Sequence, residues 1–278
     1  MSSTLPAEFS FSQSSLQDYV DCPRRFELRY ILRQAWPAVQ AQPVIEHERQ
    51  IWRGMAFHRL VHQLAVGIPL EALGDSISDD ELFRWWRSYL DNPPQDLPAR
   101  VRLTEVSLRT FVGEYRLVAK YDLLTADAER VVIVDWKTGT HRPASTWLAR
   151  RLQSRVYPYV VVEAGAGALN MPTIVPAQVS MVYWFPEFPQ QSVVLEYRGA
   201  AHTENRDYLA GLIAEIASRA PGGFPLTDDM RACRFCVYRS LCERDMAAGH
   251  SDEMEEVGAD SNWTDLDIDL ENVTEIAY

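Results

Sequence analysis

The triplet Asp135-Trp136-Lys137 stands at the end of the apolar run Val131–Trp136. Alternation along a strand places residues 135 and 137 on the same face of a sheet. A carboxylate there can hold Mg²⁺ or Mn²⁺, and a neighbouring ammonium can orient a water molecule or neutralise charge that develops on a phosphate. These residue types therefore suggest metal-assisted chemistry on a phosphodiester.

A second carboxylate, Asp122, strengthens this interpretation. It lies near the end of the preceding predicted strand, and a turn around residues 126–129 would join the two strands into a hairpin. Two carboxylates and a lysine on adjacent strands suit a hard cation and a phosphodiester. The alternative is a solvated hairpin edge with a salt bridge.

Two histidines and a glutamate lie on neighbouring predicted elements. His58 and His62 stand one turn apart on a predicted helix, and Glu105 lies on the first of the three predicted central strands. Histidine is a common metal ligand, but a lone helical histidine is more often a packed or surface residue. Glu105, taken by itself, is expected to be an exposed acid.

The four cysteines are unevenly spaced, with Cys22 far upstream of Cys233, Cys236 and Cys242. In a chain expected to be cytosolic, this favours metal or redox chemistry over disulfides. Four thiolates suit either zinc or an iron–sulfur cluster. Zinc sites usually take their ligands from two close pairs, which this spacing does not offer. A shared site would tie the first helix to the C-terminal region.

The elements that must position these residues follow from hydrophobic periodicity. Residues 1–11 look like a loose lead-in, and Ser12 or Ser14 caps a helix that Pro23 interrupts. Further helices are expected over 46–66, 145–164 and 201–219, and strands over 101–110, 114–125, 131–136, 178–185 and 192–197. From residue 46 the order is α, β, β, β, α, β, apart from a Trp-rich helix capped by Asp79 or Asp80. We therefore predict an α/β fold with a mixed central sheet flanked by helices.

Composition excludes several classes of protein. Hydrophobic residues make up 47% and charged residues 24% of the 278 positions, as in globular proteins. No stretch approaches the roughly 18–20 apolar residues of a membrane helix, and no signal pattern is present, so a cytoplasmic location without membrane contact is expected. Neither lysine of the chain, Lys120 or Lys137, follows a glycine, which excludes a Walker phosphate loop.

The net charge of −12 is concentrated in residues 251–278, which contain ten acids and no Lys or Arg. The rest of the chain is nearly neutral, so the acidic total does not argue against a nucleic-acid partner. We expect this acidic tail to aid solubility. The alternatives are that it occupies a DNA-binding cleft or docks on a partner.

In chain order the motifs resemble those of a known family. They are Ser12-x3-Leu16-x2-Tyr19-x2-Cys22-Pro23-x2-Phe26, Gly54-x3-His58, Asp122, Asp135-Trp136-Lys137-Thr138-Gly139, Gln153-x3-Tyr157 and Cys233-x2-Cys236-x5-Cys242. This series is similar to the RecB-type branch of the PD-(D/E)xK nucleases. It is most similar to the members that have an iron–sulfur cluster, which are the CRISPR-associated exonucleases and the nuclease domains of AddB-like repair proteins. The αβββαβ order agrees with the restriction-endonuclease-like core of that family.

The resemblance implies a role for each matching residue. His58, Asp122 and Asp135 would ligate the metal together with the Trp136 carbonyl, and Lys137 would position or activate the attacking water. Gln153 and Tyr157 would contact substrate or the lysine. Glu105 is a candidate outer-sphere participant. His62 has no counterpart in the family and is expected to be a packing residue. The family often has Gly three residues before the second-strand aspartate, where this chain has Ala119.

The resemblance also implies an activity and its cofactors. We expect a DNA exonuclease that depends on Mg²⁺ or Mn²⁺ and acts on single-stranded ends. It would serve DNA repair or recombination, or CRISPR spacer acquisition. Its partner would be a helicase or a CRISPR integrase complex. A [4Fe–4S] cluster on Cys22, Cys233, Cys236 and Cys242 would join the terminal regions as a clasp. The alternative function is an iron–sulfur adaptor that binds DNA ends and has little nuclease activity.

Five arginines near the motifs are candidate phosphate contacts: Arg24, Arg25, Arg150, Arg151 and Arg155. For Arg24 and Arg25 a solvated helix face is the alternative.

We expect a single nuclease domain over residues 1–250. Its core would span about 46–200, with cluster-binding elements at 12–32 and 225–247 and a Trp-rich helical insert at about 70–98.

Overall fold

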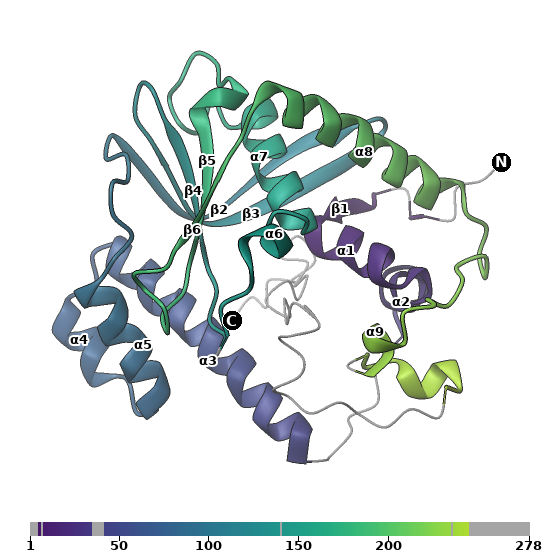
Figure 1. Ribbon diagram of the computed structural model, residues 1–278, viewed down its shortest axis with the longest axis horizontal. Helices are drawn as coiled ribbons and strands as arrows, with labels where there is room; N and C mark the ends of the chain where they lie inside the picture. The colour runs from purple at the N-terminus through teal and green to yellow at the C-terminus, as the bar shows by residue number, and fades with distance from the viewer. Residues whose placement is uncertain (1–4, 7, 35–41, 140, 235, 245–278) are drawn as a thin grey trace, which may run out of the picture.

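A computed structural model describes residues 5–6, 8–34, 42–139, 141–234 and 236–244 (Figure 1). The strands are β1 (Ser10–Ser12), β2 (Val101–Val112), β3 (Tyr115–Ala126), β4 (Val131–Trp136), β5 (Val179–Trp184) and β6 (Val193–Glu196). The helices are α1 (Gln13–Asp21), α2 (Pro23–Phe26), η1 (Glu27–Ile31), α3 (Gln42–Ala65), α4 (Leu70–Asp75), α5 (Asp80–Asp91), α6 (Ser145–Leu148), α7 (Leu152–Ala164), η2 (Pro176–Gln178), α8 (Gly199–Ser218), α9 (Met230–Arg234) and η3 (Arg239–Cys242). The acidic tail 251–278 lies outside the described residues.

The six strands form one mixed sheet centred on β3. This strand pairs antiparallel with β2 along its length, parallel with β1 through residues 116–118, and antiparallel with β4 through residues 123–126. Strands β4 and β5 are parallel, and β6 runs antiparallel to β5. The predicted α/β class with a mixed sheet is confirmed, and the order α3, β2, β3, β4, α7, β5 matches the predicted series.

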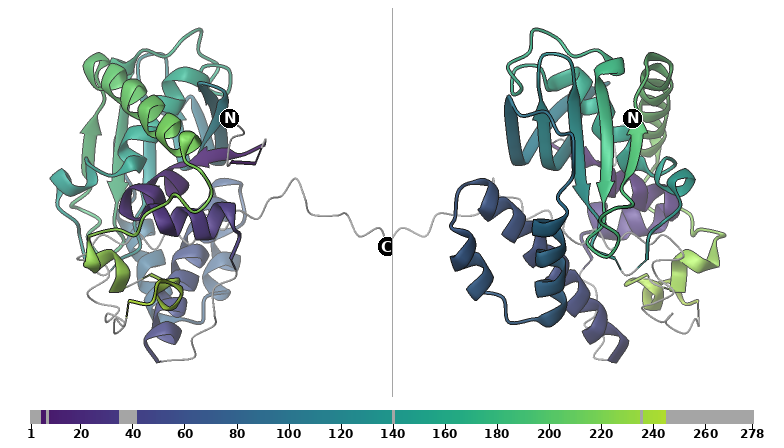
Figure 2. Two further views of the ribbon diagram at one scale, coloured as in Figure 1. Left: turned by 90° about the vertical axis from the view of Figure 1, so that its right-hand side faces the viewer. Right: turned by 60° about the vertical axis from the view of Figure 1, so that its left-hand side comes forward.

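Helices cover both faces of the sheet, as Figures 1 and 2 show. Helices α1, α7 and α8 pack against one face, and α3, α4 and α5 against the other. All six residues of β4 are buried, which explains why its sequence is an unbroken apolar run. Trp85 and Trp86 of α5 are 1% exposed and belong to the same core cluster as Trp184, so the Trp-rich insert forms part of a core layer.

Two local expectations were wrong. Residues 10–12 form β1 rather than a loose lead-in, because the first part of β3 offers an edge that only the folded chain brings close. The helix expected over 145–164 is two helices, since Arg151 takes an extended backbone conformation before α7 begins. The cap expected at Ser12 is confirmed: its side chain accepts a hydrogen bond from the Ser15 N–H.

Within the described part of the chain, no helix is long and apolar enough to cross a membrane.

Candidate active site

The candidate site lies where the carboxyl end of β4 meets the middle of β3, since the two strands are antiparallel. The ladder between these strands begins at the pair Leu123 and Val134, so Asp122 lies one residue outside it. From there its Oδ2 accepts a hydrogen bond of 2.9 Å from the Trp136 N–H. Asp122 and the Asp135-Trp136-Lys137 segment are therefore neighbours, as the sequence predicts.

His58 reaches the same place from α3, on one face of the sheet. Its Nδ1 lies 3.2 Å from Asp122 Oδ1, and its Nε2 donates to the Trp136 carbonyl oxygen over 3.1 Å. Burial favours the neutral imidazole, but the carboxylates of Asp122 and Asp135 outweigh it and raise the pKa of His58. The charged imidazole in turn outweighs the effect of burial on Asp122 and lowers the pKa of that carboxyl.

Asp135, Lys137 and Gln153 form the other half of the site. Asp135 is buried, and burial raises its pKa to about 6 although Lys137 Nζ lies 3.0 Å from its Oδ2. Gln153, at the start of α7 on the opposite face of the sheet, donates from Nε2 to Asp135 Oδ1. Its Oε1 accepts a 2.8 Å hydrogen bond from Lys137 Nζ. One amide thus holds both members of the ion pair.

Glu105 is closer to the centre than its sequence context suggests. Glu105 lies in β2 opposite Asp122 of β3. Its neighbours Thr104 and Val106 pair with β3, but Glu105 itself does not, and its φ is 53°. Left-handed backbone at a residue other than glycine costs of order 1–3 kcal/mol and is typical of functional sites. Glu105, His58 and Asp122 each offer a ligand atom, and these atoms all lie within 4.8 Å of one another. No sequence pattern announces such a backbone conformation inside a strand.

The remaining predicted site residues are placed differently. Tyr157 is buried in the core, with its ring centroid 5.0 Å from that of Tyr121. His62 Nδ1 lies 2.7 Å from Thr104 Oγ1, in agreement with a packing role.

The five candidate arginines do not share one environment. Arg150 is exposed, and the Arg151 guanidinium lies 4.9 Å from the Trp147 ring centroid. Arg155 binds Asn205 and Glu204 of α8, and Arg24 pairs with Glu27. The guanidinium of Arg25 is held by two carboxylates, so a solvated helix face does not describe it.

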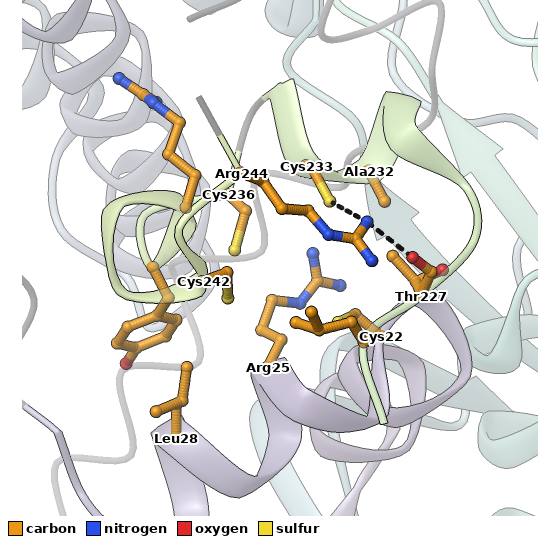
Figure 3. Close-up of a pocket in the computed structure, with 12 residues that line it drawn as sticks. Cys22, Arg25, Leu28, Thr227, Ala232, Cys233, Cys236, Cys242 and Arg244 are labelled. Atoms are coloured by element: carbon orange, nitrogen blue, oxygen red, sulfur yellow. Dashed lines mark hydrogen bonds between the residues drawn. The ribbon is translucent and has the colours of Figure 1, made fainter. Parts of the chain in front are cut away.

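The four cysteines line a single pocket, which Figure 3 shows. Cys22 lies between α1 and α2, whereas the other three come from α9, η3 and the segment between them. All four are free thiols, and burial raises the pKa of Cys236 to about 11. Arg25 and Arg244 also line the pocket, and Arg244 Nη1 lies 3.5 Å from Cys233 Sγ. Segments from the two ends of the described chain therefore converge here.

Gly54 explains why α3 can bring His58 so close to β4. A Cβ atom at Gly54 would lie 2.8 Å from Thr138 Oγ1 and 3.9 Å from Thr138 Cβ, just after the Asp135-Trp136-Lys137 segment. The lack of a side chain at Gly54 thus lets α3 approach this loop closely, and His58 follows one helical turn later.

Comparison with known proteins finds a matching family model and similar solved structures. The model of the PD-(D/E)XK nuclease superfamily matches residues 10–243. No curated protein matches. Among solved structures, a putative exonuclease from Eubacterium rectale is similar with a TM-score of 0.50 and 10% identity, over 90% of this chain and 93% of that one. SSO0001 gives a TM-score of 0.40 and 13% identity over 86% and 87%.

The Gly54 contact yields a first prediction. Gly54→Ala should weaken Mn²⁺ binding about tenfold, because displacing groups behind metal ligands typically has effects of this size. Isothermal titration with Mn²⁺ measures it. Alanine is the better helix former, so without the clash the substitution would stabilise the protein.

The double variant Gly54→Ala/Thr138→Ala should restore the affinity, because the nearest remaining Thr138 atom is then 3.9 Å away. Thr138→Ala alone is the control. If Gly54→Ala and the double variant lost the same Mn²⁺ affinity, the contact with Thr138 would not be the cause of the loss.

Proposed function

Because this chain belongs to the PD-(D/E)XK nuclease superfamily, we propose that it is a Mg²⁺- or Mn²⁺-dependent deoxyribonuclease that acts as an exonuclease on single-stranded DNA ends. The observation that carries the proposal is the meeting of two groups where β4 ends beside the middle of β3. One is the potential metal-binding group of His58, Glu105 and Asp122, and the other is the ion pair of Asp135 with Lys137. The description of the Eubacterium rectale protein as a putative exonuclease agrees with this activity.

The residues present fit a divalent cation. Carboxylate oxygens and an imidazole nitrogen are suitable donors, and the Trp136 carbonyl, beside His58, offers another oxygen. Asp135 Oδ2 is buried, and its 3.0 Å contact with Lys137 Nζ is an ion pair without good hydrogen-bond geometry, so the oxygen keeps a lone pair that a cation could take. We assign ligation to His58, Asp122 and Asp135, with Glu105 as a further carboxylate. When bound, the cation polarises the scissile phosphate and lowers the pKa of a water molecule.

Lys137 supplies the fixed positive charge of the site. Asp135 and Gln153 hold its Nζ from two sides, so little reorganisation is needed when negative charge develops on the phosphate. From this position the ammonium can orient the attacking water. Gln153 keeps the lysine in place, and Tyr157, one turn along α7, supports that helix from the core.

DNA would approach along the start of α7. Arg150 and Arg151 stand there, one exposed and one half-buried against Trp147. Contacts of arginines with phosphates should make binding weaken as salt rises. Following the family resemblance, we place the activity in the cytoplasm, in DNA repair or recombination or in CRISPR spacer acquisition, beside a helicase or an integrase complex.

We further propose that Cys22, Cys233, Cys236 and Cys242 hold a [4Fe–4S] cluster that clasps the N-terminal helices to the C-terminal segment. The convergence of four thiols on one pocket supports this. Three arginines, Arg25, Arg239 and Arg244, line the same pocket and would offset the negative charge of cysteine thiolates.

The four sulfur atoms do not all lie as close together as a single zinc ion requires. A tetrahedral site with Zn–S bonds of about 2.3 Å requires sulfurs about 3.8 Å apart. Among the described residues, no three of these cysteines have sulfur atoms that all lie within 4.8 Å of one another. We therefore propose a cluster rather than a single zinc ion.

The second prediction concerns Lys137. Lys137→Ala should lower cleavage of end-labelled single-stranded DNA by at least about a hundredfold, because a preorganised charge at the phosphate is lost. The assay uses protein purified without oxygen and supplied with Mn²⁺ or Mg²⁺. Labelling either end also reveals the direction of digestion. Arg116→Ala, which removes an exposed cation paired with Glu8, is the matched control and should cleave normally.

Retained cleavage in Lys137→Ala would refute the site. Absence of cleavage by the unmodified protein, with DNA-end binding intact, would instead support the adaptor function.

The third prediction concerns Cys22. Cys22→Ser should lose most of the bound iron and sulfide and lower the melting temperature by at least about 5 °C, since a group bound only by the folded state stabilises it. Iron, zinc and sulfide analysis with a thermal melt measures both. Val20→Ser, an exposed substitution on the same helix, is the control. An unchanged melting temperature would refute the clasp, and one zinc per chain would refute the cluster.

A further inference from the structure

Helix α7 begins without a cap from its own sequence. Its N-cap residue, Arg151, makes no side-chain hydrogen bond to the first turn. The first N–H groups of a helix have no partner within the helix and must find one elsewhere. Gln17 of α1 supplies it: its Oε1 accepts a 3.2 Å hydrogen bond from the Leu152 N–H.

The residue after Leu152 is Gln153, the amide that holds the catalytic pair. Gln153 is 2% exposed and contacts both Asp135 and Lys137. A shift of the first turn of α7 therefore moves the amide that positions Lys137. Displacements of about 1 Å can lower catalysis by about a hundredfold.

Gln17 is itself held in one orientation. Its Nε2 donates to Asp21 Oδ1 over 2.8 Å, which directs Oε1 to Leu152 and settles which end of the amide faces the helix. The other oxygen of Asp21 accepts a 2.8 Å hydrogen bond from Arg25 Nη2.

Arg25 connects this series of contacts to the cysteines. It lines the cysteine pocket, and Figure 3 shows its side chain among those of Cys22, Cys236 and Cys242. Its Nε also lies 2.8 Å from Asp18 Oδ1, so the cation is anchored to α1 by two carboxylates. A change of charge in the pocket acts directly on this guanidinium.

We propose that Gln17 is a positioning residue of the nuclease site. Through the Leu152 N–H it sets the position of Gln153, and through Asp21 and Arg25 it makes that position depend on what the cysteine pocket holds. The inference rests on the proposed nuclease function for its effect on catalysis and on the proposed cluster for its link to the pocket, but the contact between Gln17 and the Leu152 N–H can be tested separately.

The structural test is the exchange rate of the Leu152 amide hydrogen, followed by NMR on the full chain. Gln17→Leu should raise this rate about fivefold, as expected for the loss of one ordinary hydrogen bond. Gln178→Leu is the matched control, because it removes a similar bond from a glutamine side chain to the Val175 N–H at a remote site. An unchanged rate in Gln17→Leu would overturn the proposal.

The link to the cysteine pocket is tested by emptying that pocket. Removal of bound iron with a chelator should raise the Leu152 exchange rate in the unmodified protein and leave it unchanged in Gln17→Leu, where the link is already broken. Equal responses in the two proteins would overturn the link.

The catalytic part is tested on single-stranded DNA. Gln17→Leu should lower kcat about fivefold with KM nearly unchanged, because substrate contacts are intact. Asp21→Asn should have a smaller effect of the same kind, and the double variant should match Gln17→Leu alone, since both act through one contact. If the double variant instead lowered kcat by the product of the two single effects, Gln17 and Asp21 would not act through the same contact.

The outcomes separate this inference from the proposed function. Faster Leu152 exchange with kcat unchanged would overturn the positioning role while nuclease activity stands. Absence of cleavage by the unmodified protein would refute the proposed function, and the exchange measurements would still decide the structural link.

Discussion

A buried carboxylate at the end of β4 is the constraint around which the site is organised. Asp135 is 4% exposed, and a charge in such a place is unfavourable unless it is paired and hydrogen-bonded. Lys137 provides the charge and Gln153 the hydrogen bond. The strand must end, and α7 must begin, where these two side chains can reach the carboxylate.

The central sheet separates the two helical layers, and the site forms where β4 ends and both layers can contribute. Helix α3 brings His58 from one face, since Gly54 allows it to approach the loop after β4. Helix α7 brings Gln153 from the other face. Helices α4 and α5 pack against α3 in the same core cluster as β4 and so support the side of the site that carries His58.

Helix α1 links the remaining parts of the molecule. Its Tyr19 donates a 2.6 Å hydrogen bond to Glu215 of α8, and Cys22 at its end joins the pocket formed by the C-terminal segment. Its Gln17 caps α7. The segment before α1 is anchored as well, because β1 pairs with β3. The N-terminal region is thus an integral part of the fold on which the arrangement of the site depends.

The sequence by itself determined the order of the elements and which residues are candidates for the site. The types and spacing of Asp122, Asp135 and Lys137 indicate a cation and a phosphodiester, and the periodicity of apolar residues gives the α/β order, because both are local properties of the chain. Only the tertiary structure decided that Glu105 joins the potential metal-binding group, since its φ of 53° follows from no local pattern. The same holds for the Gln17 cap, which joins residues 135 positions apart. Such contacts are set by how whole layers pack, and no short stretch of sequence contains that information.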